Sequence, residues 1–298
     1  MKILAQLLAL SLAGISAARG AAPLVDHHQH LLNPTMAEPG QKPILAKDLV
    51  AMLDAAGIRR AVVLSNAFRY GDHARVVVEN DWTASEAAKY PKRLVAYCSF
   101  NPLKDYALAE LARCAAAKRF GRGIKLQFGS SDVDLDDPVD VAMLRRVFRA
   151  ANANRLTIVV HLRTARSHGY GAAQARVVLD ELLAAAPDVR VQIAHLAGGG
   201  GGSLDAGAEQ ALSAFEEAFA RKDPHVKNLY FDLSGAVGGE GWPANAPVIT
   251  RHIRALGVAH IVYGSDGGDP TDPLAKAVVA AYRLLPLSKA EFSVIDGN

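Results

Sequence analysis

Short runs of β-branched and aliphatic residues recur along the chain, about 30 to 40 residues apart, with longer Ala- and Leu-rich segments between them. Each run is four to six residues long and most are largely apolar, which is typical of strands buried on both faces of a parallel sheet. The pattern therefore predicts eight strands, at residues 24–28, 61–64, 94–98, 123–126, 157–161, 189–194, 228–233 and 259–263.

The segments between these runs repeat their apolar residues with a helical period, so they predict amphipathic helices. Asp137-Pro138 is a typical helix start, and Gly57 and Gly257 stand where helices typically end. The predicted helices cover residues 46–56, 75–89, 105–118, 139–152, 172–186, 204–221, 246–256 and 273–285.

Eight alternations of strand and helix predict a single (β/α)8 TIM barrel, a fold of the α/β class. The alternative is a doubly wound open sheet, which would carry a Gly-x-Gly-x-x-Gly turn after its first strand. No such turn follows the first run, and the only glycine run, Gly198 to Gly202, follows the sixth. No interdomain linker is visible, so residues 21–298 are expected to form one barrel domain.

The first twenty residues have the pattern of an export signal: Lys2, an apolar run at residues 3–15, and then small residues. The apolar run is 13 residues long, whereas a helix that spans a bilayer needs about 20. Residues 1–20 are therefore predicted to be a signal peptide cleaved after Gly20, with cleavage after Ala18 or an uncleaved anchor as alternatives. We expect a periplasmic or secreted protein with no stable membrane insertion after signal removal.

Composition is that of a globular protein, since 50% of the residues are hydrophobic and 21% are charged. The net charge of +3 includes Lys2 and Arg19 of the predicted signal, and no basic run follows. Nucleic acid is therefore not an expected partner. The sequence leaves open whether the chain forms a homo-oligomer. It also leaves open whether its two cysteines, Cys98 and Cys114, form a disulfide or stay as buried thiols.

Three histidines directly follow the apolar lead-in of the first predicted strand. Side chains alternate along a strand, so Asp26, His28 and His30 are predicted to share one face while His27 and Gln29 point the other way. Two imidazoles separated by one residue can converge on one metal ion, although ordinary hydrogen-bonded histidines would give the same pattern. Asp26, one step deeper, is predicted to support the ligands from behind.

Further ligand-type residues follow other predicted strands: His161 ends the fifth, His195 the sixth, and Asp266 lies just after the eighth. In a barrel the C-terminal ends of the strands meet around one mouth, where active sites are built. Unrelated core histidines would not be expected to fall at so many strand ends. The sequence therefore predicts one polar site at this mouth.

This arrangement resembles the amidohydrolase superfamily, specifically its amidohydrolase-2 branch of metal-dependent hydrolases, lactonases and nonoxidative decarboxylases. The resemblance covers nearly the whole chain after the signal. It implies that His28, His30, His161 and Asp266 hold one divalent metal ion and that His195 acts beside it on the substrate. It is carried by Asp26-His27-His28-Gln29-His30, Tyr90-Pro91-Lys92-Arg93-Leu94, Asn101-Pro102, Gly123-Ile124-Lys125-Leu126, His195-Leu196-Ala197-Gly198-Gly199, Tyr230-Phe231-Asp232-Leu233-Ser234 and Tyr263-Gly264-Ser265-Asp266.

The expected chemistry is hydrolysis of a small ester, lactone or amide by a metal-activated water. Three imidazoles and a carboxylate suit zinc, with manganese or iron as alternatives. Asp266 is predicted to accept the proton of the water, and His195 to contact the substrate carbonyl. The alternative is nonoxidative decarboxylation of an aromatic or unsaturated carboxylic acid at the same site. A noncatalytic protein that binds metal or ligand is a third hypothesis.

Candidate substrate-binding residues lie on the same predicted mouth. Lys125 is on the fourth strand, where binuclear relatives use a carboxylated lysine between two metals, and pairing with substrate or with a nearby carboxylate is the favoured role. Arg163 follows the fifth strand and is predicted to bind a substrate carboxylate, so the small-molecule substrate is expected to be anionic. Phe68, Arg69, Tyr70 and His73 follow the second strand and are candidates for the pocket wall.

Overall fold

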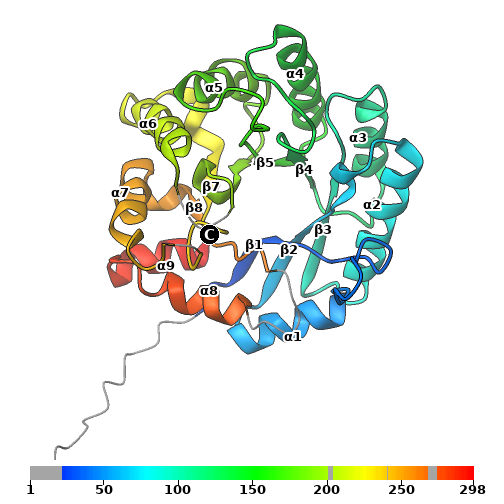
Figure 1. The fold of residues 1–298 in the computed structure, drawn as a ribbon, viewed down its shortest axis with the longest axis horizontal. Helices are drawn as coiled ribbons and strands as arrows, with labels where there is room; N and C mark the ends of the chain where they lie inside the picture. Colours follow the sequence, from blue (N-terminus) through cyan, green and yellow to red (C-terminus); the bar gives the residue numbers. More distant parts are fainter. Residues whose placement is uncertain (1–21, 201–203, 240, 268–273) are drawn as a thin grey trace, which may run out of the picture.

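Eight parallel strands form a ring at the centre of the molecule in the computed structural model, which describes residues 22–200, 204–239, 241–267 and 274–298. Helices surround the ring, as Figure 1 shows. The strands pair in chain order from β1 to β8, so the prediction of a single (β/α)8 barrel is confirmed. The strands are β1 (Val25–Gln29), β2 (Arg60–Leu64), β3 (Leu94–Ser99), β4 (Gly123–Gln127), β5 (Thr157–His161), β6 (Val191–Ile193), β7 (Leu229–Asp232) and β8 (Ile261–Val262).

All eight predicted helices are present, and two of them have the predicted bounds. The fifth changes after Val177 into a π-helical stretch, Val178–Leu183. The helices are α1 (Ala46–Ala56), α2 (His73–Ala88), α3 (Ala107–Ala116), α4 (Pro138–Ala153), α5 (Ala172–Val177), α6 (Ala206–Ala220), α7 (Ala246–Leu256), α8 (Leu274–Tyr282) and α9 (Lys289–Gly297).

The last helix, α9, was not predicted from the periodicity. Ser288 and Glu291 form a reciprocal capping box at its start. The carbonyl of Asp296 accepts a hydrogen bond from the amide of Leu24 at 3.1 Å, and the side chain of Asn298 donates to the carbonyl of Ile261 at 2.8 Å. Helix α9 therefore lies against the starts of both β1 and β8.

The ring closes between β8 and β1 through the backbone of the segment that follows β8. The amide of His27 donates to the carbonyl of Tyr263 at 2.9 Å, and the amide of Asp266 donates to the carbonyl of His28 at 2.8 Å. The second bond fixes Asp266 directly beside the first of the predicted ligands. Closure of the barrel thus brings together residues that are almost the whole chain apart.

Apolar side chains fill the space between strands and helices. Leu49 and Leu53 of α1, Phe148 of α4 and Phe215 of α6 are fully buried, and burying a side chain of this size stabilises the fold by roughly 1.5–3 kcal/mol. The polar exceptions need hydrogen-bond partners, because an unpaired buried polar group is costly. Several of these exceptions gather at the C-terminal mouth of the barrel and include Asp26, His28, Lys125, His195 and Asp232.

Cys98 of β3 and Cys114 of α3 form a disulfide, with their Cα atoms 6.3 Å apart. Of the two alternatives left open by the sequence, the bridge is therefore the one present. The bridge ties α3 to the sheet at the side of the barrel where α2, β3 and α3 meet (Figure 1).

Within the described ranges, no helix is long and apolar enough to cross a membrane. The predicted signal peptide, residues 1–20, lies outside those ranges. Its cleavage and the resulting location stay predictions.

Candidate metal centre

Strand β1 carries an irregularity at the motif that contains the histidines. Asp26 pairs with Ala61 of β2 but Gln29 pairs with Val63, so β1 holds one residue more than β2 over this stretch. The bulge breaks the simple alternation, and the side chain of Gln29 donates to Asp26 Oδ2 at 2.9 Å. The prediction that these two side chains point to opposite faces is therefore wrong.

His28 and His30 both direct one ring nitrogen toward Asp266. Each Nε2 lies 3.7 Å from Asp266 Oδ1, and the ligand atoms of the three residues all lie within 4.8 Å of one another. The other nitrogen of each ring is fixed from behind. His28 Nδ1 lies 3.0 Å from Asp232 Oδ2, and His30 Nδ1 lies 2.7 Å from the carbonyl of Leu64. Such outer contacts orient metal-binding imidazoles and select their tautomer.

The protonation states suit a cation. Burial lowers the pKa of His30 to about 3 and that of His195 to about 4, so both rings are neutral at pH 7 and offer a lone pair. Burial alone would raise the pKa of Asp266, but the nearby His28 and His30 hold it below its usual value, so the carboxylate is ionised. The neutral imidazole of His30, the imidazole of His28 and the ionised carboxylate of Asp266 form a donor set that fits a divalent metal ion.

His161 lies on the same cavity but outside this three-residue group. Its ring centroid is 4.8 Å from that of His195, which is in turn 4.8 Å from that of His28. Burial lowers the pKa of His161 well below its usual value, so this ring is also neutral. The fold brings all four predicted ligand residues and His195 to one mouth, while ligation by His161 stays a prediction.

His195 begins an unusual left-handed turn directly after β6. His195, Leu196 and Ala197 have φ angles of 60°, 48° and 61°, which is costly for residues other than glycine. The turn is held by specific contacts. The amide of His195 donates to Asp232 Oδ1 at 3.0 Å, and the Tyr170 hydroxyl donates to the carbonyl of Ala197. The strained backbone thereby aims the imidazole of His195 into the mouth.

Asp232 is central to the site, although the sequence placed it only within a motif and predicted no role for it. Besides His28, it accepts hydrogen bonds from the side chain of Gln192 at 2.7 Å and from the amide of Ser234 at 3.1 Å. Burial alone would raise its pKa, but His28 and the hydrogen bonds hold the pKa far below the usual range. One ionised carboxylate at the end of β7 therefore supports both His28 and His195. Its position as an Asp closing a buried strand was the available signal.

Asp26 supports the other side of the site. It accepts hydrogen bonds from the amides of His28 and Ser265, both at 3.1 Å, and burial raises its pKa to about 6. It therefore fixes the backbone on either side of the closure between β1 and Asp266. This agrees with the predicted supporting role, although it acts through the backbone and not through an imidazole.

The predicted ligands open onto a cavity of about 480 Å³. Lys125 lies at its base with Nζ 3.4 Å from His28 Nε2, and burial lowers the pKa of Lys125 to about 8. Phe68 and Arg69 form part of the wall, as predicted. The described lining residues are His28, His30, Leu31, Leu32, Met36, Glu38, Gln41, Ile44, Asn66, Phe68, Arg69, Lys125, Gln127, His161, His195, Gly199, Gly200, Asp266 and Gly267.

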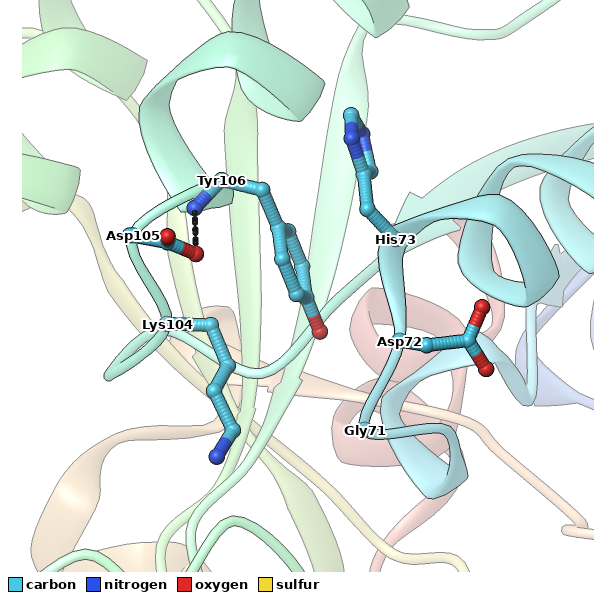
Figure 2. Close-up of a pocket in the computed structure, with 6 residues that line it drawn as sticks. All are labelled: Gly71, Asp72, His73, Lys104, Asp105 and Tyr106. Carbon is cyan, nitrogen blue, oxygen red and sulfur yellow. Dashed lines mark hydrogen bonds between the residues drawn. The ribbon is translucent and has the colours of Figure 1, made fainter.

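Two of the predicted wall residues and the predicted substrate arginine do not line this cavity in the described structure. Arg163 Nη1 forms an ion pair with Asp205 at 2.7 Å, and its guanidinium lies 4.7 Å from the centre of the Tyr170 ring. Tyr70 and His73 border separate hollows, and Figure 2 shows His73 beside Tyr106. Arg69, and not Arg163, is therefore the arginine that reaches the cavity.

The family model described as "Amidohydrolase" matches residues 25–291. A search of curated proteins found no match.

Three solved structures illustrate the fold. 5-Carboxyvanillate decarboxylase LigW from Sphingomonas paucimobilis is 16% identical, with a TM-score of 0.66 and coverage of 93% of this chain and 97% of that one. A 5-carboxyvanillate decarboxylase from Novosphingobium aromaticivorans with bound manganese is 15% identical (TM-score 0.64; coverage 94% and 96%). A probable 2-pyrone-4,6-dicarboxylic acid hydrolase from Acinetobacter baumannii is 15% identical (TM-score 0.61; coverage 92% and 96%). At such identities, these similarities show the fold alone.

Proposed function

The chain belongs to the amidohydrolase family, and we propose that it is a metal-dependent hydrolase of a small ester, lactone or amide. The observation that carries this proposal is the convergence of His28, His30 and Asp266 at the barrel mouth, with both imidazoles fixed from behind. This geometry presents lone pairs to a common point beside a cavity large enough for a small molecule.

His28, His30, His161 and Asp266 would hold the divalent ion, for which zinc is our first choice and manganese or iron the alternatives. When bound, such an ion supplies Lewis acidity and lowers the pKa of water at the site. Asp266 then accepts a proton from the attacking water and returns it to the leaving group. Its carboxylate can do so because it lies beside the ring nitrogens of His28 and His30. His195, aimed into the cavity by its left-handed turn, contacts the substrate carbonyl oxygen.

The charges on the cavity wall favour an anionic substrate. Lys125 at the base and Arg69 on the wall are cationic, and Glu38 is the one acidic residue besides Asp266 among the described lining residues. A carboxylate on the substrate would be attracted to these cations, and an arginine can bind it with two parallel hydrogen bonds. We therefore assign the substrate-binding role to Lys125 and Arg69.

Nonoxidative decarboxylation is the second candidate. The same two cations would hold the carboxylate of an aromatic or unsaturated acid against the metal site. Two of the three structural neighbours named above are decarboxylases, so the assay also includes decarboxylation.

The proposal is tested by measuring the metal content of the purified protein and assaying one sample on lactones, esters, amides and aryl carboxylates. We expect chelation to abolish turnover and added zinc or manganese to restore it. Full activity in a thoroughly demetallated sample would contradict the proposal. Carbon dioxide release from aryl carboxylates, without cleavage of any ester or lactone, would put the decarboxylase first.

Asp266→Asn is the control that separates an enzyme from a metal-binding protein without activity. Asn keeps the shape and one ligand oxygen but cannot accept the proton, so turnover should fall by about a thousandfold or more while metal stays bound. A variant that binds metal and turns over like the wild type would remove Asp266 from the mechanism.

We also propose that the protein works in the periplasm or outside the cell. The signal pattern at residues 1–20 supports export, and the Cys98–Cys114 disulfide suits an oxidising compartment. Comparing the N-terminus of the protein recovered from the periplasm with that of the full chain tests this location.

A further inference from the structure

One side of the catalytic cavity is formed by the loop between β1 and α1. We call residues 33–43 of this loop the wall segment. Three residues of the wall segment line the cavity: Met36, Glu38 and Gln41. The segment contains neither helix nor strand. Leu32 and Ile44 join the two ends of the segment through a pair of 3.1 Å backbone hydrogen bonds.

The wall segment makes most of its hydrogen bonds within itself. The amides of Met36 and Ala37 donate to the carbonyl of Asn33, and Glu38 and Gln41 bond to each other. Among the described residues, a single hydrogen bond joins the segment to the rest of the molecule, from Asn33 Nδ2 to Glu79 Oε2 at 2.8 Å. The position of the wall segment therefore depends heavily on one contact.

Glu79 is well placed to act as this anchor. It lies on α2, is only 1% exposed, and is held by the helix and not by another loop. Burial raises its pKa to about 7, although the Asn33 hydrogen bond and the charge of Arg69 both act to lower it. Glu79 thus interacts with the wall segment through Asn33 and with the cavity wall through Arg69. Arg69 itself lines the cavity, and Asn33 belongs to the segment whose Met36, Glu38 and Gln41 do so.

We propose that Glu79 is a positioning residue that holds the wall segment over the cavity through Asn33 and thereby sets how tightly substrate is bound. The part of this proposal that concerns substrate rests on the proposed function, whereas the anchoring does not. Glu79 does not line the cavity itself, so it acts through Asn33 and Arg69 and not on the reacting atoms. The proposed metal ligands stand on other segments and should stay in place when the anchor is removed.

Hydrogen exchange of the Met36 and Ala37 amides measures the anchoring directly. Both amides bond to the backbone carbonyl of Asn33, so changes in side chains do not remove their acceptor. In Glu79→Ala, these amides should exchange about tenfold faster or more, because the buried hydrogen bond between Asn33 and Glu79 is lost. Glu79→Gln keeps an acceptor for Asn33 and should stay closer to the wild type. Asn33→Ala removes the same bond from the other side and should match Glu79→Ala.

Glu86→Gln is the matched control. Glu86 is also a buried glutamate of α2, at 6% exposure, but it accepts from the amide of Ala46 at the start of α1 and not from the wall segment. Exchange at Met36 and Ala37 should be unchanged in this variant. Unchanged exchange in both Glu79→Ala and Asn33→Ala would overturn the proposal, whatever the protein catalyses.

Kinetics test the effect on substrate. With a substrate found in the panel, Glu79→Ala should raise KM by about tenfold and change kcat by no more than about threefold. The reason is that substrate binding by the wall segment is weakened while the reacting groups stay in place. An equal loss confined to kcat would overturn the substrate part of the proposal. Faster exchange in a protein that turns over none of the panel would support the anchor while contradicting the proposed function.

Discussion

Two buried carboxylates in this molecule each hold a histidine, and the two pairs look alike in isolation. Asp232 Oδ2 lies 3.0 Å from His28 Nδ1 at the barrel mouth, and Glu110 Oε2 lies 3.2 Å from His73 Nε2 between α2 and α3. Both carboxylate side chains are fully buried. Only the first pair belongs to the candidate metal centre.

The pairs differ in what surrounds them. Arg113 binds both oxygens of Glu110, at 2.8 and 2.7 Å, and so neutralises the carboxylate. His73 is 41% exposed and stacks on Tyr106 at the hollow drawn in Figure 2. In contrast, the other nitrogen of His28, Nε2, is buried and faces Asp266 and Lys125. A histidine held by a carboxylate therefore indicates a metal ligand only when its other nitrogen converges with further donors.

The largest effects should come from removing each carboxylate in turn. Asp232→Ala should weaken metal binding by about 10- to 100-fold, because His28 and His195 lose the group that orients them. Glu110→Ala should leave metal affinity unchanged but lower the free energy of unfolding by about 3 kcal/mol, since Arg113 loses its buried partner. Metal titration against a chromogenic chelator and urea unfolding followed by tryptophan fluorescence measure the two quantities.

The opposite result would contradict the distinction between the His28–Asp232 and His73–Glu110 pairs. If Glu110→Ala weakened metal binding as much as Asp232→Ala, the two pairs would not be functionally distinct. The matched control is Gln192→Ala, which removes one hydrogen bond to Asp232 but keeps its charge. Its metal affinity should lie closer to that of the wild type.

The sequence predicted the barrel because its signal is repeated eight times, and errors at single boundaries do not change the topology. The mouth was predictable for the same reason, since strand ends in a barrel must meet. Residues that directly follow a buried run, such as His161, His195 and Asp266, were therefore placed correctly at one mouth.

Features that depend on local geometry could not be predicted in this way. The bulge in β1 changes the face of Gln29 without a glycine or proline to mark it. Arg163 lies on the loop after β5, as predicted, but its guanidinium is paired with Asp205, 42 residues later in the chain. The anchor between Asn33 and Glu79 joins a loop to a helix 46 residues away and has no periodic signal at all. Such contacts depend on how the folded chain brings distant residues together, so the sequence pattern alone does not predict them.

The disulfide offers a smaller perturbation of the Glu110 side of the comparison. Cys114 Sγ lies 3.6 Å from Glu110 Oε1, and the bridge closes a loop with a sequence separation of 16. Changing Cys98 and Cys114 together to Ser should lower the free energy of unfolding by up to about 3 kcal/mol, because the unfolded chain is no longer constrained.

Metal affinity of this double variant should stay within about twofold of the wild type, since the bridge touches none of the proposed ligands. Reducing the wild type with dithiothreitol provides the control, because it should reproduce the loss of stability without any substitution. A tenfold loss of metal affinity in either sample would show that the β3–α3 side and the mouth are coupled.

The smallest expected effect is a change with pH. Burial alone would raise the pKa of Glu110, but the hydrogen bonds from Arg113, Asn80 and His73 hold it below the usual value near 4.5. A carboxyl whose pKa is lower in the folded state stabilises the fold above its unfolded pKa and loses this contribution as the pH falls through the folded pKa. The difference in unfolding free energy between the wild type and Glu110→Gln should therefore be constant from pH 7 to about pH 5 and shrink in more acidic solution. Urea unfolding across this range measures it, and a difference that grows on acidification would mean that Glu110 is protonated in the folded protein and that Arg113 does not neutralise it.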